Sequence, residues 1–184
     1  MLAAGASSRM GSNKLLLMLD GEPLVRRATR RALAAGLEPV VVVLGREPER
    51  AQLALSGLAC RFAFNATPQS PMSRSLHSGL EALPAGIDAA IVTLADMVSV
   101  TADMLREIAS AAEETSAPLI ASRYGGVLAP PMLFRRVLFA ELLLSDGEGC
   151  GRSVVERHCA DALILDWPAE ALLDVDTPEE FAKL

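Results

Sequence analysis

A turn of small residues near the start of the chain offers backbone amides and two cations to an anion. The segment reads LAAGASSRMGSNK from Leu2 to Lys14, with Arg9 inside the turn and Lys14 just beyond it. Little side-chain bulk between Gly5 and Gly11 blocks the approach of several backbone N–H groups to one anion. Arg9 adds a planar guanidinium and Lys14 a movable point charge. This spacing predicts a polyphosphate site.

A simpler interpretation is that the small residues only make a tight turn and that both cations are solvated. Two cations at this spacing, at the head of an α/β chain, favour phosphate binding. The segment is neither a P-loop nor a GxGxxG dinucleotide motif, because Lys14 does not follow Gly11 directly.

Aspartates follow two extended runs later in the chain. Asp96 ends the run AAIVTLAD, and the carboxyl ends of parallel strands form the crevice where α/β sheets bind ligands. Since Mg²⁺ takes one or two carboxylates plus phosphate oxygens, we expect Asp96 to be a metal ligand rather than only a cap of the next turn. Asp174 and Asp176 alternate in an extended run, so only one of them can easily reach the same metal.

These motifs together resemble the signature of the MobA-like nucleotidyltransferases, LAAGxSxRMGxxK. The resemblance extends over nearly the whole chain, through TLADM at 93–97, YGG at 124–126 and DVDTPEEF at 174–181. The chain most resembles the molybdenum cofactor cytidylyltransferases, because these tend to carry LAAG where guanylyl relatives carry LAGG. Ala4 places it with the former, and Val98 stands where TLADM is usually followed by proline.

The resemblance implies a role for each matching residue. Arg9 and Lys14 would be catalytic, and Asp176 rather than Asp174 would hold Mg²⁺ together with Asp96. The segment 65–79, NATPQSPMSRSLHSG, resembles the part of the family that holds the nucleotide base and opens a helix, with Pro71 in place of a glycine. The expected nucleotide-binding residues are Leu2, Ala3, Ala4, Gly5, Ser7, Ser8, Gly11, Asn65, Ser73, Ser75 and Gly79. For Ser73, a role as helix N-cap is an equal alternative.

The acceptor side of the site is expected at Tyr124, Gly125 and Gly126 and the following VLAPPMLF. Arg152, in the glycine-rich segment 146–152, could meet a phosphate there, unless that segment is only a solvated loop. Many relatives that handle the molybdenum cofactor have Gly-His-Pro in this area, where this chain has Ala129-Pro130-Pro131.

The expected reaction is the Mg²⁺-dependent transfer of CMP from CTP to a phosphorylated small molecule, with release of pyrophosphate; another NTP would donate its own nucleoside monophosphate. The expected acceptor is most closely a molybdopterin-type molybdenum cofactor. Because Gly-His-Pro is missing, a sugar- or polyol-phosphate nucleotidyltransferase stays an alternative. The other alternative is a non-catalytic maturation factor that binds a nucleotide or a cofactor. The resemblance also implies a molybdoenzyme as the client that receives the product.

Composition excludes several other classes of protein. The formal net charge of −6 argues against a nucleic-acid partner. We see no run of transmembrane length and no signal peptide, and we expect no membrane association. The three cysteines are odd in number and lack metal-site spacing, which favours the cytoplasm.

Short apolar runs alternate with helical periodicity, which predicts an α/β fold with a mostly parallel sheet and helices on both faces. The resemblance makes this a three-layer, Rossmann-like fold of the nucleotide-diphospho-sugar transferase type. The 184 residues are expected to form a single domain, 1–184, with a nucleotide-binding half of about 1–100 and an acceptor-side half of about 101–184. Strands are expected at 40–44, 61–65, 89–94, 119–122 and 163–166, and helices at 23–35, 48–56, 73–83, 102–114, 135–144 and 152–159.

Two helix starts carry capping signals, Thr101 and the sequence Thr177-Pro178-Glu179-Glu180. A strand before the first turn has only residues 1–4 available, whereas strands average about five or six residues. Either the chain begins further upstream or this strand is short.

Overall fold

A computed structural model describes residues 1–5, 13–67, 71–147, 151–175 and 177–182. Two hydrogen-bonded ladders meet at its centre. One contains β1 (Leu2–Ala3), β4 (Val40–Leu44) and β5 (Cys60–Phe64), all parallel and in the order β1-β4-β5. The other has the order β6-β8-β7-β9 and contains β6 (Ala89–Val92), β7 (Leu119–Tyr124), β8 (Val127–Arg135) and β9 (Leu163–Trp167).

The first strand joins the two ladders just beyond the end of β6. The Leu2 N–H donates to the Thr93 carbonyl at 2.8 Å, and the Ala95 N–H donates to the Leu2 carbonyl at 3.1 Å. The strands therefore lie in the order β5-β4-β1-β6-β8-β7-β9. The carboxyl ends of β1, β4, β5 and β6 point to one edge, where segment 93–96 passes β1.

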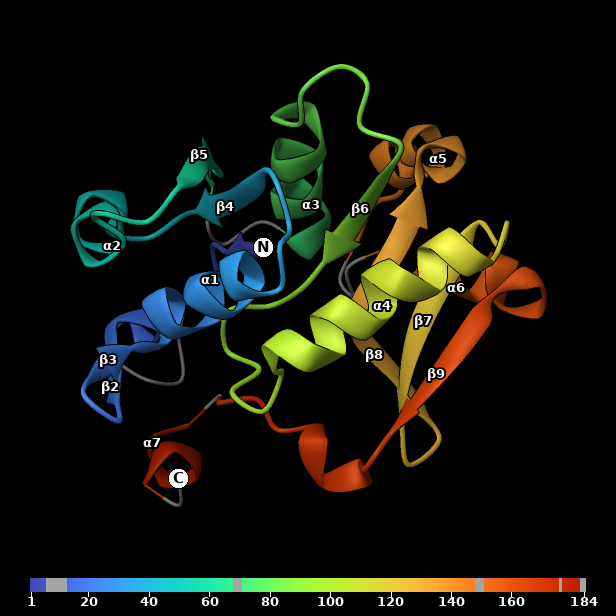
Figure 1. The fold of residues 1–184 in the computed structure, drawn as a ribbon. Helices are drawn as coiled ribbons and strands as arrows, with labels where there is room; N and C mark the ends of the chain where they lie inside the picture. Colours follow the sequence, from blue (N-terminus) through green and yellow to red (C-terminus); the bar gives the residue numbers. More distant parts are fainter. Residues whose placement is uncertain (6–12, 68–70, 148–150, 176, 183–184) are drawn as a thin grey trace.

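Helices cover both faces of the sheet, which confirms the predicted three layers. One face packs against α1 (Leu24–Ala34), α2 (Pro48–Ala54) and α4 (Ala102–Glu114). The other packs against α3 (Met72–Glu81), α5 (Phe139–Leu144) and α6 (Arg152–His158). Figure 1 shows α1 and α4 crossing in front of the strands. No helix in the described ranges is long and apolar enough to cross a membrane.

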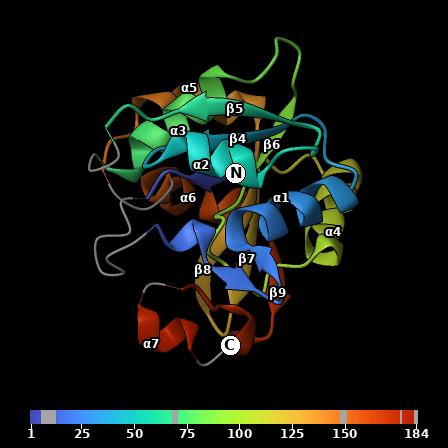
Figure 2. The same cartoon turned by 90° about the vertical axis from the view of Figure 1, so that its left-hand side faces the viewer.

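Short elements complete the chain around these layers. The strands β2 (Met18–Leu19) and β3 (Glu22–Pro23) form a hairpin before α1. The 3₁₀ turns are η1 (Lys14–Leu16), η2 (Arg136–Leu138), η3 (Cys159–Asp161) and η4 (Ala169–Ala171). The last helix, α7 (Pro178–Phe181), lies apart from the sheet near the C-terminus (Figure 2).

Both predicted caps are confirmed. The Thr101 hydroxyl accepts a hydrogen bond from the Met104 N–H at 3.2 Å and begins α4. At α7 the Thr177 N–H donates to the Glu180 carboxylate at 2.8 Å, and the Glu180 N–H donates to the Thr177 hydroxyl at 3.2 Å. This reciprocal pair is a capping box.

The antiparallel strand β8 was missed, and the helix predicted at 135–144 begins too early, because Arg135 still belongs to β8. Pro130 and Pro131 argue against a strand, since proline cannot donate to a ladder. Both fall where the β7–β8 register shifts, between the pairs Ala121↔Met132 and Arg123↔Leu128. There the Ser122 hydroxyl donates to the Pro131 carbonyl at 2.6 Å, so a side chain satisfies this carbonyl where the ladder is interrupted.

Gly45 allows the chain after β4 to pass directly against β1. A Cβ at this position would lie 2.6 Å from the Ala4 carbonyl oxygen. We expect Gly45→Ala to lower the free energy of unfolding by about 2–3 kcal/mol, because backbone atoms on both sides must shift. Urea denaturation measures this.

Gly79→Ala is the matched control. Its Cβ would meet only a methyl group of Val43, at 3.0 Å, and alanine favours the helix by about 1 kcal/mol. Equal losses in the two variants would contradict a specific backbone approach at Gly45.

Candidate active site

An ion pair joins the two charged residues that the sequence placed at the centre of the site. The Lys14 ammonium lies 2.6 Å from the Asp96 carboxylate, and their side chains are only 10% and 18% exposed. Lys14 begins η1, whereas Asp96 follows the segment that pairs with β1. The fold therefore brings the predicted catalytic residue Lys14 into contact with the predicted metal ligand Asp96.

Asn13 fixes the backbone that carries Lys14. Its side-chain carbonyl accepts a hydrogen bond from the Leu15 N–H at 3.2 Å and caps η1. Its amide group donates to the Arg46 carbonyl at 3.0 Å, in the loop after β4. Asn13 is buried and was not among the predicted site residues. Its signal in the sequence is a cap-forming residue directly before the lysine.

The segment that contains the second aspartate motif runs antiparallel to the residues around Asp96. The Val175 N–H donates to the Asp96 carbonyl at 3.3 Å, and the Val98 N–H donates to the Leu173 carbonyl at 3.2 Å. Asp174 forms a β-bridge with Met97, and its side chain is exposed. The predicted ligand Asp176 lies outside the described residues, but the motif that contains it lies beside Asp96.

Arg31 holds the turn after Asp96 from the side of α1. One guanidinium nitrogen donates to the carbonyls of Val98, at 2.6 Å, and Val100, at 2.7 Å. Withdrawal from water lowers the pKa of the Arg31 guanidinium from its usual value. Helical periodicity could not separate this arginine from Arg27 and Arg30 on the same helix, so the sequence did not identify it.

Two residues expected on the base side contact each other. The Asn65 side-chain amide donates to the Ser75 hydroxyl at 3.0 Å, and both side chains are buried. The Asn65 side-chain oxygen accepts from the Thr67 N–H at 3.0 Å. Asn65 follows β5 directly, so this network lies at the carboxyl edge of the sheet.

Ser73 is not a helix N-cap, because Pro71 occupies that position and Ser73 is the second residue of α3. Its N–H donates to the Gly147 carbonyl at 3.2 Å. Ser73 and Arg152 line one polar hollow of about 190 Å³, together with residues of the segments around Ser145 and Glu156. A predicted base-side residue and a predicted acceptor-side residue therefore share this hollow.

Four more predicted site residues lie away from this hollow. Gly79 lies within α3, where a Cβ would press on Val43 of β4. Tyr124 is buried and donates to the Pro130 carbonyl at 3.0 Å, and burial raises the pKa of Tyr124 to about 12. Gly125 and Gly126 turn the chain from β7 into β8 at positive φ angles of 53° and 96°. None of the four lines the hollow that contains Arg152.

The structure describes the chain up to Gly5 and again from Asn13, on either side of the predicted phosphate-binding turn, here called the phosphate turn. Leu2 and Ala3 form β1, and Ala4 and Gly5 continue from it toward the carboxyl edge, with Ala4 against Gly45. The remaining predicted residues lie outside the described ranges: Ser7, Ser8, Arg9 and Gly11.

Comparison with known proteins assigns the family. The MobA-like NTP transferase domain matches residues 1–162. The chain belongs to the MobA-like NTP transferase family. It is therefore a nucleotidyltransferase-family protein with the nucleotide-diphospho-sugar transferase fold, as the sequence motifs indicated.

Among its relatives, the purine catabolism protein PucB of Bacillus subtilis is 30% identical over 98% of this chain and 91% of its own length. A probable molybdenum cofactor guanylyltransferase of Synechococcus elongatus is 47% identical over 30% of this chain and 27% of its own length. The structure of Rv0371c from Mycobacterium tuberculosis, in complex with manganese, superposes with a TM-score of 0.83 at 23% identity. That superposition covers 100% of this chain and 94% of the other.

The residues present fit a divalent cation held jointly with a substrate. Within the described ranges, no three His, Cys, Asp or Glu side chains gather into a cluster that could hold a metal. Asp96 instead offers a carboxylate that already has a cationic group 2.6 Å away. Mg²⁺ is commonly held by one or two carboxylates together with substrate phosphate oxygens, so Asp96 fits a cation that arrives with a nucleotide once the Lys14 ammonium moves off the carboxylate.

We expect the Lys14–Asp96 pair to show a coupling energy of about 1–3 kcal/mol in a double-mutant cycle of Lys14→Met and Asp96→Asn. Either single change removes one charge of a shielded pair and leaves the other, whereas the double change removes both charges. Urea denaturation of the four proteins gives the value.

The exposed pair Arg123–Asp166, whose atoms are also 2.6 Å apart, is the matched control, because water screens it. A Lys14–Asp96 coupling no larger than that of Arg123–Asp166 would show that the pair is not held as described.

Proposed function

We propose that this protein transfers CMP from CTP to a phosphate-bearing acceptor, most closely a molybdopterin-type molybdenum cofactor, and releases pyrophosphate. The contact between Lys14 and Asp96 carries this proposal. It lies at the carboxyl edge of the sheet, beside the end of β1 from which the phosphate turn begins. A cation and a carboxylate in reach of one polyphosphate are what nucleotidyl transfer requires.

Lys14 is proposed to act on the α-phosphate. Its ammonium lies 2.6 Å from the Asp96 carboxylate, and a nucleotide would offer it phosphate oxygens at the same edge of the sheet. The acceptor phosphate would attack the α-phosphorus in line, and Lys14 would neutralise the charge that builds there. Arg9 would neutralise the leaving pyrophosphate, and the backbone N–H groups of the turn would hold the triphosphate.

Asp96 and Asp176 are the proposed ligands of Mg²⁺. The manganese bound by the Mycobacterium tuberculosis protein supports a divalent cation in this fold. When bound, such a cation neutralises phosphate oxygens and orients the reacting groups. Asp96 would hold it, and the backbone bonds from Val175 to Asp96 would keep the second aspartate motif nearby.

The base would bind at the Asn65–Ser75 pair. An amide and a hydroxyl that already bond each other form an ordered polar edge, to which cytosine can present its own amide-like groups. The choice of cytosine over guanine rests on Ala4, where one methyl group cannot supply full discrimination alone.

The acceptor would bind at the hollow between Ser73 and Arg152. Arg152 now pairs with Glu156 at 3.0 Å, and an acceptor phosphate would compete for its guanidinium. A sugar- or polyol-phosphate acceptor remains the second candidate, because residues 129–131 belong to β8 and do not form Gly-His-Pro. A protein that only binds nucleotide or cofactor would not require the Lys14 ammonium to contact the Asp96 carboxylate, which is proposed to hold the metal.

We expect Lys14→Ala to lower kcat by at least about a hundredfold, since the loss of one such electrostatic contact raises the barrier by about 3–4 kcal/mol. The assay measures pyrophosphate release from CTP and from GTP, each with Mg²⁺ and with molybdopterin or a sugar phosphate as acceptor. Arg30→Ala, which removes an exposed cation far from Asp96 in the chain, is the control with unchanged turnover.

Each arm of the assay tests a separate statement. Normal kcat in a folded Lys14→Ala protein would refute the role of the lysine. A preference for GTP would refute the base assignment alone, and turnover with a sugar phosphate but not molybdopterin would refute the acceptor. Absence of pyrophosphate release with every pair of substrates would favour a protein that only binds nucleotide or cofactor.

A further inference from the structure

The helix α3 contacts both sides of the proposed site. On the base side, its Ser75 hydroxyl accepts a hydrogen bond from Asn65. On the acceptor side, its Ser73 N–H donates to the Gly147 carbonyl. His77 lies one turn after Ser73, so these two residues share a face of the helix. The His77 side chain is half-buried, and the proposed transfer step does not use it.

The His77 imidazole bonds two carbonyl groups at the end of α5. Its Nε2 lies 3.0 Å from the Leu142 carbonyl oxygen and 2.9 Å from the Ser145 carbonyl oxygen. Because a carbonyl oxygen only accepts, Nε2 must carry the hydrogen. The last carbonyls of a helix have no donor within the helix. His77 therefore supplies a donor that the end of α5 needs.

Leu142 connects this contact to Arg152. The buried Leu142 side chain lies against Gly151, where a Cβ would approach a Leu142 methyl group to 2.5 Å. Gly151 has a φ of 80° and is the N-cap of α6, whose first residue is Arg152. A shift of Leu142 would therefore move the start of α6 and the Arg152 guanidinium with it.

The segments on both sides of this contact line the polar hollow of about 190 Å³. Ser145 and Gly147 contribute one part of its wall, and Arg152 contributes another. Asp146 and Glu156 also line it, so an acceptor in the hollow meets carboxylates that accept hydrogen bonds as well as a guanidinium that donates them. Such a set of groups recognises a ligand well only when the distances between the groups are fixed.

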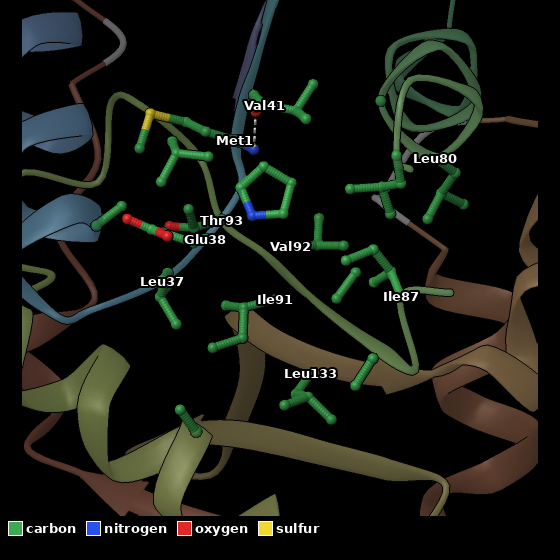
Figure 3. Close-up of a pocket in the computed structure, with 18 of the residues that line it drawn as sticks. Met1, Leu37, Glu38, Val41, Leu80, Ile87, Ile91, Val92, Thr93 and Leu133 are labelled. Carbon is green, nitrogen blue, oxygen red and sulfur yellow. Dashed lines mark hydrogen bonds between the residues drawn. The ribbon is translucent and has the colours of Figure 1, made fainter. Parts of the chain in front are cut away.

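The core anchors α3 to the sheet. Leu76 and Leu80 of this helix belong to the apolar cluster that contains Val43 of β4 and Val92 of β6. Figure 3 shows Leu80 beside Val92, where both line an apolar hollow of about 290 Å³. The helix that carries His77 is therefore held by the sheet and can keep the end of α5 in place.

We propose that His77 is a positioning residue for the acceptor. By holding the carbonyls at the end of α5, it fixes the wall of the polar hollow at 145–147 and the position of Arg152. This inference rests on the proposed function, because it takes the polar hollow as the acceptor site. The Asn65–Ser75 pair does not contact His77, so binding of the nucleotide is independent of it.

The test measures the kinetics of His77 variants in the pyrophosphate assay. His77→Gln places an amide N–H near the position of Nε2, whereas His77→Asn is shorter and His77→Leu has no donor. We expect His77→Leu and His77→Asn to raise the KM for the acceptor at least about fivefold, with the KM for CTP within about twofold. His77→Gln should restore the KM for the acceptor. Ser78→Ala is the control with unchanged kinetics, because the Ser78 hydroxyl bonds only Arg74 of the same helix.

Hydrogen exchange gives a readout that needs no acceptor. Ser73 is the second residue of α3, so its N–H has no partner within the helix and reports the contact with the Gly147 carbonyl. We expect His77→Leu to speed exchange of the Ser73 amide at least about tenfold. His77→Gln should leave it unchanged.

A lower kcat with an unchanged KM for the acceptor would overturn the inference, because it would mean only that less protein is folded. An equal rise in the KM for CTP, or failure of His77→Gln to restore the KM for the acceptor, would also overturn it and leave the proposed function standing. Unchanged exchange at Ser73 would show that His77 does not fix the segment. Wild-type protein that releases no pyrophosphate with any acceptor would refute the proposed function, and with it the role of His77 toward the acceptor.

Discussion

The Lys14 ammonium and the Asp96 carboxylate lie 2.6 Å apart at the edge of an apolar sheet, and most of the other contacts around the site position these two groups. A carboxylate shielded from water is stabilised by a nearby cation, and that cation must stay within reach of the site rather than be buried in the core. Lys14 meets this need from a short 3₁₀ turn rather than from a long helix. Because its backbone is fixed by Asn13 and its side chain is long, the ammonium can move while its anchor does not.

Separate parts of the chain hold the two ends of this pair. β1 is tied to both neighbouring ladders, which fixes the register of residues 93–96 against β4. Arg31 holds the turn after Asp96, and the backbone of residues 173–175 covers its other side. Gly45 lets the loop after β4 approach Ala4, and that loop accepts the bond from Asn13. The site is thus assembled by backbone contacts that place a few polar side chains at one edge.

The sequence predicted the features that depend on local pattern. The continuous β-branched run at 40–44 and the capped helix at 102–114 were predicted with their observed bounds. The motifs placed Lys14 and Asp96 in one site, but their direct contact was not predicted. β8 could not be predicted, because its prolines are tolerated where extra residues of β8 shift the β7–β8 register, and local pattern does not show this long-range pairing. The packing of Gly79 against Val43 and the burial of Tyr124 were not predicted, because a motif does not show which of its residues face the core.

Metal binding at Asp96 is the central claim, and anomalous X-ray diffraction from crystals grown with CTP and Mn²⁺ tests it most directly. We expect an anomalous peak within coordination distance, about 2.0–2.2 Å, of the Asp96 carboxylate. We also expect that the Lys14 ammonium has left that carboxylate for a phosphate oxygen. A nucleotide bound with the Lys14–Asp96 contact intact and the metal elsewhere would contradict it.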